Sequence, residues 1–269
     1  MKLFLHIVNP VQAPPSSDLY RAQPITFQSM QVAKSFAESS GVSVLQCAAF
    51  YEEDRLAVPT GFSECPVLTR SCSDFATMTP PRRLPLLADI LDRGRDATAA
   101  TYVIYTNVDI ALMPHFYVTA DYIMRQGYDA ITICRRTLSQ DYKGVEELPR
   151  MYADMGVNHP GTDCFIVKRE LLEQFDLQNV VIGAQFVAFA LRVNLHLFAK
   201  HIKEFPSLHM TFHIGDDRAW ASQRDYSSFN AREVDAMFNA LAARADLANP
   251  EKLKLFREDF NRRKEKALG

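Results

Sequence analysis

The chain has 269 residues, of which 48% are hydrophobic and 23% charged, and its formal net charge is −2. A chain of this length buries about three quarters of the surface that its unfolded form exposes, so its core needs neither disulfides nor a structural metal. The near-neutral charge argues against a dedicated nucleic-acid-binding protein, because such proteins carry a basic excess. We therefore expect no nucleic-acid partner.

The cysteines and the apolar runs indicate a cytoplasmic protein. The five cysteines are odd in number and never form a CxxC pair, so neither a disulfide framework nor a zinc ribbon is predicted. Residues 1–10 lack a small-residue cleavage site, which favours a first strand over a signal peptide. Even the apolar run 180–191 stops at Arg192, too early to span a bilayer. We expect reduced thiols and no integral membrane segment.

Alternating strands and helices predict an α/β fold with helices flanking a mainly parallel central sheet. We expect one domain over residues 1–225, followed by a helical, basic tail over 226–269. In chain order the patterns predict strand 3–8, helix 18–38, strand 42–50, a mostly irregular stretch 52–81 with strand-like residues at 66–69, helix 82–93, strand 102–106, helix 114–126, strand 130–134, a polar mobile loop 135–159, strand 164–167, a long buried helix 180–199 and strand 207–213.

The tail carries a local excess of positive charge. Residues 251–268 contain seven Lys and Arg and four Asp and Glu, with Leu253, Phe256 and Phe260 among them. The favoured interpretation is a solvated terminal helix docked by its apolar residues. The alternative is peripheral contact with the inner membrane surface, because basic amphipathic helices bind anionic lipid.

Polar side chains directly after the strand 102–106 mark a candidate metal site. Two oxygen-bearing side chains, Asn107 and Asp109, stand one residue apart there. Such a pair can share a hard cation such as Mg²⁺ or Mn²⁺, with the oxygens of a diphosphate completing the shell. The alternative is that Asn107 and Asp109 form a turn or cap the next helix.

A second polar cluster lies at residues 211–220, just past a predicted strand. An imidazole such as that of His213 suits Mn²⁺ more than Mg²⁺, and Arg218 could pair with phosphate oxygens in a forked geometry. The alternative for His213 is a hydrogen-bonded structural residue. GxGxxG, GxxxxGK[ST], HExxH and GxSxG motifs are absent, which argues against Rossmann dehydrogenases, P-loop enzymes and serine hydrolases.

The chain resembles the GT-A glycosyltransferases in three segments that follow one another in order. They are Arg83-Leu84, residues 102–109 (YVIYTNVD) and residues 213–220 (HIGDDRAW). This family comprises the nucleotide-diphospho-sugar transferases of the glycogenin and bacterial lipopolysaccharide galactosyltransferase type. These segments are similar to the family's Arg-Leu, Asp-x-Asp and His-x-x-Gly-x-x-Lys-Pro-Trp. The resemblance implies a GT-A, Rossmann-like fold, Mn²⁺ or Mg²⁺ as cofactor, a nucleotide-diphospho-sugar donor and a glycan or glycolipid acceptor.

The resemblance also implies roles for single residues. Asn107, Asp109 and His213 would hold the metal, while Arg83 and Arg218 would face the diphosphate. Asn9 and Pro10 are expected to line the nucleotide pocket, because α/β sheets bind ligands at the carboxyl ends of their strands.

Two further positions correspond to sugar-contacting segments of the family. Residues 159–165 resemble one such segment, in which Asp163 could bind a sugar hydroxyl or act as a base. Gln185 resembles the Gln of the Asp-Gln pair in retaining relatives, but Ala184 replaces the acid. A buried helix start is the alternative for Gln185, and a retaining or an inverting outcome stays undecided.

The predicted function is therefore metal-dependent hexosyl transfer from a nucleotide-diphospho-sugar to an acceptor hydroxyl, in cell-surface glycan or related glycoconjugate synthesis. The loop 135–159 is expected to close over the donor and exclude water. A catalytically inactive GT-A-like binding protein is one alternative, since Asn107 and Ala184 depart from the family pattern. A metal-dependent sugar nucleotidyltransferase is the other, although residues 9–15 lack its glycine-rich basic loop.

Overall fold

The computed structural model describes residues 3–215, 223–244 and 249–268. The chain forms two compact units. The first comprises residues 1–68, 91–169 and 201–217, and the second comprises 69–90, 170–200 and 218–269.

The first unit holds the sheet and the second is helical. The strands are β1 (Leu3–Val8), β2 (Ser43–Ala48), β3 (Ser63–Glu64), β4 (Tyr102–Thr106), β5 (Ala111–Leu112), β6 (Ala130–Leu138), β7 (Val157–Lys168), β8 (Ile202–Phe205) and β9 (Thr211–Ile214). The other elements are α1 (Asp18–Ser39), η1 (Glu52–Ala57), η2 (Cys72–Asp74), α2 (Leu87–Ala97), α3 (Phe116–Met124), η3 (Val145–Glu147), α4 (Leu148–Ala153), η4 (Arg169–Gln174), α5 (Val187–Phe198), α6 (Arg224–Ala242) and α7 (Pro250–Leu268).

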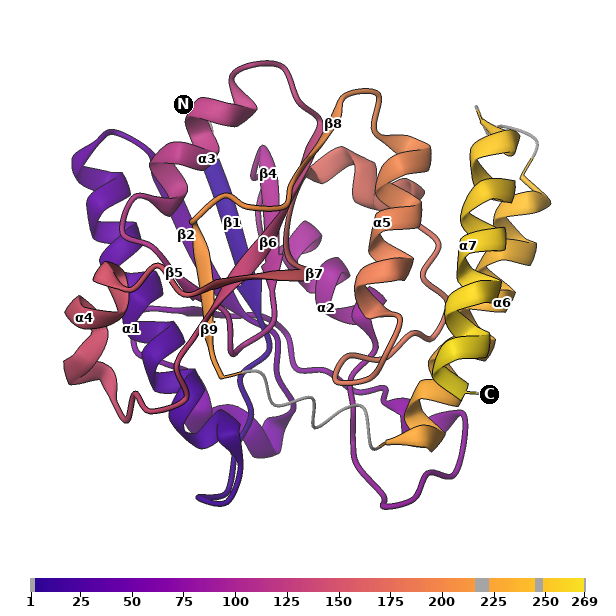
Figure 1. Ribbon diagram of the computed structural model, residues 1–269, viewed down its shortest axis with the longest axis horizontal. Coiled ribbons are helices and arrows are strands. Elements are labelled where there is room, and N and C mark those ends of the chain that lie inside the picture. The colour runs from indigo at the N-terminus through magenta and orange to yellow at the C-terminus, as the bar shows by residue number, and fades with distance from the viewer. Residues whose placement is uncertain (1–2, 216–222, 245–248, 269) are drawn as a thin grey trace. The chain divides into compact units, whose positions relative to one another are not determined.

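Nine strands of the described chain make one sheet in the order β3-β2-β1-β4-β7-β6-β9-β5, with β8 also paired to β6 (Figure 1). Parallel pairings join β1 with β2 and β4, β2 with β3, and β6 with β8 and β9. Antiparallel pairings join β7 with β4 and β6, and β5 with β9. The predicted α/β class with a mainly parallel central sheet is confirmed.

The short link between β4 and β5 makes this sheet curl. Strands β4 and β5 lie four neighbours apart along the sheet, which in a flat sheet is about 19 Å. The link runs only from Thr106 to Ala111. It contains a turn in which the Ile110 amide donates to the Asn107 carbonyl at 3.2 Å, and this turn limits the distance that the link can span to below about 15 Å. The sheet therefore curls until the carboxyl end of β4 reaches the edge formed by β9 and β5.

Helices α1 and α3 cover one face of the sheet and exclude water from it. Apolar side chains of α1 at helical spacing, Met30, Ala33 and Ala37, are fully buried against the strands. Strands contribute side chains from alternate positions to this face, and the intervening positions of β1 and β4 are buried on the opposite face. The main core cluster includes Phe4, Val8, Phe116, Tyr117, Ala120, Tyr102, Ile104, Ile131, Ile133 and Ile166.

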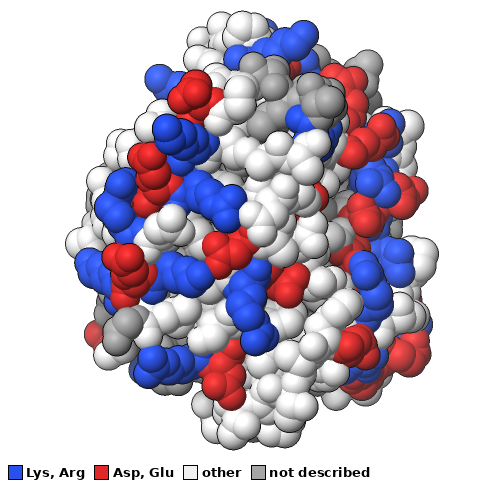
Figure 2. Space-filling model, turned by 90° about the vertical axis from the view of Figure 1, so that its right-hand side faces the viewer, with Lys and Arg blue, Asp and Glu red and all other residues white. Residues whose placement is uncertain are grey.

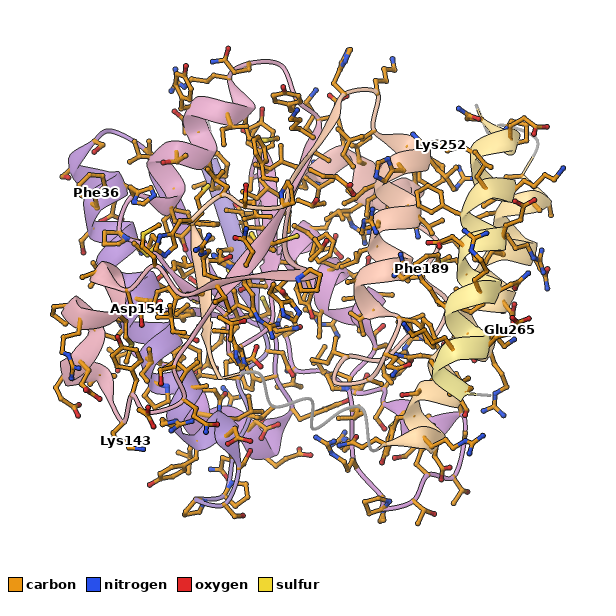
Figure 3. The ribbon with its side chains drawn as sticks, in the orientation of Figure 1. Phe36, Lys143, Asp154, Phe189, Lys252 and Glu265 are labelled. Carbon is orange, nitrogen blue, oxygen red and sulfur yellow. The ribbon has the colours of Figure 1, made fainter. Side chains whose placement is uncertain are left out.

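The prediction of a mobile loop over residues 135–159 is wrong. Strand β6 runs to Leu138, helix α4 covers 148–153 and β7 begins at Val157. The few apolar residues of this segment suffice to anchor it, because Leu138, Leu148 and Met151 are buried in a second core cluster. Asp154, labelled in Figure 3, ends α4 and accepts a hydrogen bond from the Tyr142 hydroxyl at 3.0 Å.

Two predicted helices begin later than expected. Helix α2 starts at Leu87, because Pro85 has no N–H to donate and keeps the residue before it out of the helical region. Helix α5 starts at Val187, because Gly183 and Phe186 adopt positive φ angles of 74° and 72°. The strand predicted at 66–69 lies instead at Ser63–Glu64, and the strand predicted at 207–213 is Thr211–Ile214.

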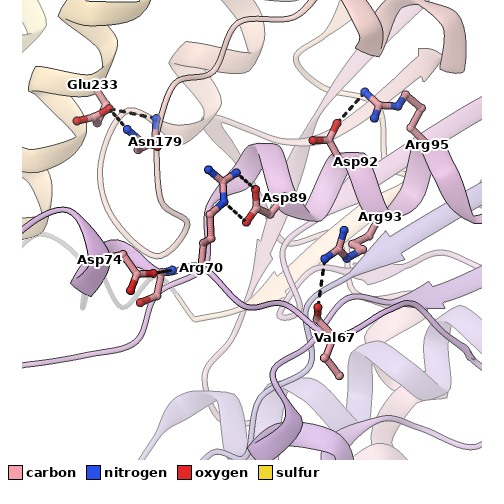
Figure 4. A network of polar contacts seen from close by, with 10 residues as sticks. Val67, Arg70, Asp74, Asp89, Asp92, Arg93, Arg95, Asn179 and Glu233 are labelled. Atoms are coloured by element: carbon pink, nitrogen blue, oxygen red, sulfur yellow. Dashed lines mark hydrogen bonds and ion pairs between the residues drawn. The ribbon is translucent and has the colours of Figure 1, made fainter.

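Ion pairs and hydrogen bonds fix the loops of each unit (Figure 4). In the second unit Arg70 pairs with Asp89, and the Asn179 side-chain amide donates to Glu233 at 3.0 Å. In the first unit the Arg93 guanidinium donates to the Val67 carbonyl at 3.2 Å. The contacts of Arg70 and Val67 order the polar stretch that separates β3 from α2.

The C-terminal tail is a helix docked by its apolar residues. Phe260 is fully buried, and its ring lies 5.5 Å from that of Phe189 on α5, which Figure 3 labels, and 5.7 Å from that of Phe238 on α6. Figure 2 views the face that carries α7 and shows Lys and Arg interspersed with Asp and Glu. Among the described helices, none is long and apolar enough to cross a membrane.

Candidate active site

Asn107 and Asp109 form the turn that ends β4. The Ile110 amide donates to the Asn107 carbonyl at 3.2 Å, and Asn is favoured at the first position of such turns. The Asn107 side-chain oxygen accepts a hydrogen bond from the Tyr105 hydroxyl at 2.9 Å. The turn interpretation is therefore correct for the backbone, and it directs both polar side chains to the end of the sheet.

The curl of the sheet brings Asp109 against His213 of β9. His213 Nε2 lies 3.3 Å from Asp109 Oδ2, although the residues are 104 positions apart in sequence. His213 Nδ1 lies 2.8 Å from the Gly215 carbonyl oxygen and must donate to it, because a carbonyl can only accept. This contact orients the imidazole with Nε2 toward the carboxylate.

Each partner of this pair favours the charged form of the other. Burial alone raises the pKa of Asp109, but the hydrogen bond and the charge of His213, helped by Arg135, outweigh it and hold the pKa below its usual value. Burial alone lowers the pKa of His213, and the contact with Asp109 outweighs it and raises the pKa. Asp109 is therefore held as a carboxylate beside a histidine whose charged form it favours.

The Asp163 side chain lies near Asp109 and His213 and comes from a bulge in β7. Ile133 of β6 pairs with Cys164, whereas the next residue, Cys134, pairs with Thr162, so Asp163 is an extra residue on β7. A second register shift follows, where Pro160 stands in the strand without an N–H to donate. Bulges re-aim side chains beside active sites, and this one presents a carboxylate at the end of the sheet.

Arg135 of β6 forms an ion pair with Asp163. Arg135 Nη1 lies 3.0 Å from Asp163 Oδ1, and each side chain is only 12% exposed. Burial raises the pKa of Asp163 to about 6, since it outweighs the attraction of Arg135 and is reinforced by the repulsion from Asp109. The shift places Asp163 close to the range in which a carboxylate serves as a base at neutral pH.

Two carboxylate oxygens in this cluster have no hydrogen-bond partner in the described chain. They are Asp109 Oδ1 and Asp163 Oδ2, both buried. Buried carboxylate oxygens normally find donors, so an unsatisfied pair indicates a place for a ligand or a cation. The strands that carry the cluster, β4, β7, β6 and β9, are consecutive neighbours in the sheet.

The donor set fits a divalent cation shared by Asp109 and His213. Ligating histidines usually donate their other ring nitrogen to a carbonyl or carboxylate, as His213 does to Gly215. The Asp109 side chain is 26% exposed, which leaves access for substrate oxygens. Among the described residues, no group of three or more His, Cys, Asp and Glu side chains is arranged as a metal centre. A cation here would therefore draw further ligands from Asn107 and from a substrate.

Asn9 and Pro10 lie at the carboxyl end of β1. Both are buried, and the Asn9 side-chain amide donates to the Ala49 carbonyl at 2.7 Å, which ties the end of β1 to the end of β2. The next residues line a groove of about 570 Å³ whose other walls are α1 and residues 56–60. Its lining has no charged side chain: Val11, Gln12, Ala13, Tyr20, Gln23, Pro24, Phe27, Gln28, Gln31, Leu56, Ala57, Val58, Pro59 and Thr60.

Two of the other predicted site residues, Arg83 and Gln185, belong to the second unit. Arg83 is exposed in the second unit, just before the bridge that Pro85 makes with Ser71. Gln185 precedes α5 in a turn, and its carbonyl accepts from the Asn230 side-chain amide at 2.8 Å. Arg218 lies outside the described residues.

Arg135 is the site residue that the sequence analysis missed. It directly follows the predicted strand 130–134 but opens the segment 135–159, which composition marks as a mobile loop, so it was not considered as a site residue. Pro160-Gly161, shortly before the apolar strand 164–167, was the available signal, because proline and glycine in a strand indicate a bulge.

Comparison with known proteins shows the fold. No family model matches the chain, and no curated protein matches its sequence. Residues 1–349 of S. aureus TarS, in complex with UDP-GlcNAc, superpose with a TM-score of 0.56 at 12% identity over 98% of this chain and 73% of that chain. Glucosyl-3-phosphoglycerate synthase of M. tuberculosis, in complex with Mg²⁺ and UDP, gives 0.52 at 14% identity over 88% and 79%.

These two structures are nucleotide-sugar glycosyltransferases of the GT-A fold. At 12–14% identity the likeness shows the fold alone. The chain therefore has the GT-A fold that its motifs predict.

Proposed function

We propose that this chain is a metal-dependent glycosyltransferase that moves a sugar from a nucleotide-diphospho-sugar to an acceptor hydroxyl. The observation that carries the proposal is the Asp109–His213 pair, 3.3 Å apart, beside the ion pair of Arg135 and Asp163. The fold supports it, because two solved structures with that fold hold UDP-GlcNAc, or UDP with Mg²⁺.

The proposed donor site combines the cluster with the groove beside β1. Asp109 and His213, with Asn107 next to them, would hold Mn²⁺ or Mg²⁺. Such a cation stabilises the negative charge that develops on the departing nucleoside diphosphate. The uncharged groove that follows Pro10, with its aromatic and carboxamide side chains, suits a nucleobase.

Asp163 is the proposed catalytic base. The acceptor oxygen forms its bond to the anomeric carbon as the bond to the diphosphate breaks, and the acceptor proton passes to Asp163. This direct displacement inverts the anomeric centre, which agrees with Ala184 in place of the acid of retaining relatives. With a pKa of about 6, Asp163 is both ionised at neutral pH and more basic than an exposed carboxylate.

The remaining roles rest on the resemblance to the GT-A family. Arg83 and Arg218 would face the diphosphate, Gln185 would face the sugar, and the acceptor would be a glycan or glycolipid. Contact of the basic tail with an anionic membrane surface stays a prediction.

A thermal-melt panel of nucleotide sugars, with and without Mn²⁺, tests the proposal. We expect one donor to raise the melting temperature, and Asp109→Ala to remove the part of the shift that depends on Mn²⁺. Asp96→Ala is the matched control, because Asp96 pairs with Arg95 on the surface. Absence of any shift with every donor overturns the proposal.

The inactive binding protein is the second candidate, and Asn107 in place of an acid favours it. Donor hydrolysis separates the two. A glycosyltransferase slowly hydrolyses its bound donor in the presence of Mn²⁺, whereas an inactive domain binds the donor and leaves it intact.

A further inference from the structure

We propose that Arg135 exchanges partners when the donor binds: it holds Asp163 in the donor-free protein and turns to the diphosphate in the complex, which releases Asp163 for the acceptor hydroxyl. The inference rests on the proposed function and concerns the regulation of the same site. It makes Arg135 a diphosphate-binding residue and makes the base available only when a donor is present.

The geometry shows that Asp163 is engaged before any substrate arrives. Arg135 Nη1 lies 3.0 Å from Asp163 Oδ1, and both side chains are nearly buried. An arginine lowers the basicity of the carboxylate that it contacts, because the guanidinium keeps its charge and favours the ionised form. Asp163 therefore gains reactivity when the guanidinium moves away.

A diphosphate is the ligand best suited to draw the guanidinium away. The fork of N–H donors on arginine matches phosphate oxygens in two-point contacts, and the charge of a diphosphate exceeds that of one carboxylate. Arg135 also lies within electrostatic reach of the proposed metal pair, since its charge acts on both Asp109 and His213. Thr137, two residues beyond Arg135 in β6, pairs with His213 of β9, so a diphosphate held by the Asp109–His213 pair would lie near Arg135.

Exchange of partners avoids the cost of a buried, unpaired arginine. Breaking a buried ion pair is unfavourable when one charge is left without a partner. Here the guanidinium would pass from one anion to another, and the carboxylate would meet the acceptor hydroxyl. Donor binding and base release would thus occur together.

Arg136 provides a matched control in the next position of β6. Its guanidinium donates to the Met155 and Gly156 carbonyls at 2.6 and 3.0 Å, and to the Asn158 side-chain oxygen at 2.6 Å. It carries the same charge as Arg135 but contacts the beginning of β7 instead of Asp163.

A double-mutant cycle on UDP binding with Mn²⁺, measured by calorimetry, tests the exchange. Arg135→Gln should weaken UDP binding. Asp163→Asn should tighten it about five- to tenfold, because Arg135 then gives up a neutral amide instead of the Asp163 carboxylate. In the Arg135→Gln background the Asp163→Asn substitution should change the affinity less than about twofold.

Each outcome bears on one hypothesis. Tightening of equal size in both backgrounds reflects direct repulsion between Asp163 and the diphosphate, and overturns the exchange. A wild-type protein that binds no nucleoside diphosphate overturns the proposed function instead. Arg136→Gln should bind UDP as the wild type does. Arg135→Lys keeps the charge but loses the paired N–H donors of the guanidinium, and it should bind UDP with an intermediate affinity. This variant tests whether Arg135 binds the diphosphate should Arg135→Gln fail to fold.

Discussion

Two clusters of buried polar side chains in the first unit differ in how completely their atoms are paired. In the core cluster, His6 Nδ1 lies 2.9 Å from the Tyr117 hydroxyl and Nε2 lies 2.9 Å from Thr106 Oγ1. The Gln46 side-chain amide donates to the Met30 carbonyl at 2.7 Å and contacts the Tyr117 hydroxyl at 3.2 Å. The core cluster consists of His6, Gln46, Thr106 and Tyr117.

The site cluster, which consists of Asp109, Arg135, Asp163 and His213, leaves atoms unsatisfied. Asp109 Oδ1 and Asp163 Oδ2 are buried and have no hydrogen-bond partner within the part of the chain that the structure describes. The two clusters adjoin along β4, since Thr106 ends the strand and Asn107 begins the turn.

This difference in pairing is the one expected between a polar network that stabilises the core and a polar network that binds a ligand. A fully paired network stabilises one arrangement of the core, because every polar atom there would lose its partner in another arrangement. A network that leaves carboxylate oxygens unpaired is costly in the free protein, and a bound ligand or cation would complete it. Substitutions in the core cluster should therefore lower stability and leave ligand binding unchanged. Substitutions in the site cluster should lower activity and leave stability unchanged or higher.

The largest effect is expected from Asp163→Asn. Without the base, the rate of sugar transfer should fall about 10²- to 10⁴-fold. The melting temperature in the absence of ligand should stay the same or rise at pH 7.5, because the substitution removes a carboxylate whose pKa is raised to about 6 by burial. Steady-state kinetics and thermal melts check both parts.

Asp141→Asn serves as the control for this substitution, since Asp141 is an exposed residue that contacts Ser139. It should leave both quantities unchanged. A transfer rate in Asp163→Asn within a factor of three of the wild type would contradict the assignment of the base.

A loss of stability without a loss of metal binding is expected from Tyr117→Phe. The substitution removes the hydroxyl shared by His6 and Gln46, which should lower the free energy of unfolding by about 1–3 kcal/mol. Denaturant titration measures the loss, and calorimetry with Mn²⁺ should give the wild-type affinity. A weakened Mn²⁺ affinity at full stability would place the core cluster in the site.

The pH dependence of stability should distinguish the clusters by its sign. Burial lowers the pKa of His6 to about 3, against 6.5 for an exposed histidine. The unfolded chain therefore binds a proton that the folded protein does not, and stability should fall as the pH drops from 6.5 toward 3, by up to about 1.4 kcal/mol per pH unit. Denaturant titrations across this range, with a chelator present, measure the slope.

Asp163 should have the opposite effect on the change of stability with pH, because acidification stabilises the folded protein through this residue. Its pKa is about 6 in the folded protein and 3.8 in the unfolded chain, so its contribution to stability is lost as the pH rises through this window. Asp163→Asn should therefore steepen the loss of stability on acidification between pH 6 and 4. A shallower slope in this variant would contradict the raised pKa.

The sequence predicted the sheet more fully than the site. The apolar run 102–106 and the polar residues after it identified β4, Asn107 and Asp109. Contact between Asp109 and His213 depends on the curl of the sheet, which follows from a pairing of β5 with β9 that no local pattern encodes. The role of Arg135 was hidden for a related reason, because the bulge at Asp163 is visible only in the register of β7 against β6.

Composition misled where a few apolar residues decide the structure. The polar segment 135–159 has little periodicity, yet burial of Leu148 and Met151 suffices to order α4. Conversely, the apolar run 180–191 looks helical throughout, although Gly183 and Phe186 delay the helix to Val187. Single backbone conformations of this kind are set by tertiary packing and are not visible in hydrophobic spacing.

The smallest effect is expected from Asn107→Asp, which restores an acid to the turn. A second carboxylate beside Asp109 should tighten Mn²⁺ binding about three- to tenfold, because ligand charge tunes the affinity of oxygen sites. The Tyr105 hydroxyl, which lies 2.9 Å from the Asn107 oxygen, can donate to a carboxylate equally well, so the turn should be kept.

Calorimetry with Mn²⁺ on Asn107→Asp and on the control Asn158→Asp decides whether Asn107 belongs to the site cluster or only to the turn. Asn158 of β7 contacts Arg136 of β6, so a charge at position 158 should leave the Mn²⁺ affinity unchanged. Without metal, Asn107→Asp should melt at a slightly lower temperature than the wild type, because it adds a third carboxylate near Asp109 and Asp163. An unchanged Mn²⁺ affinity in Asn107→Asp would show that the Asn107 side chain serves the turn alone and that the cation is held by Asp109 and His213 without it.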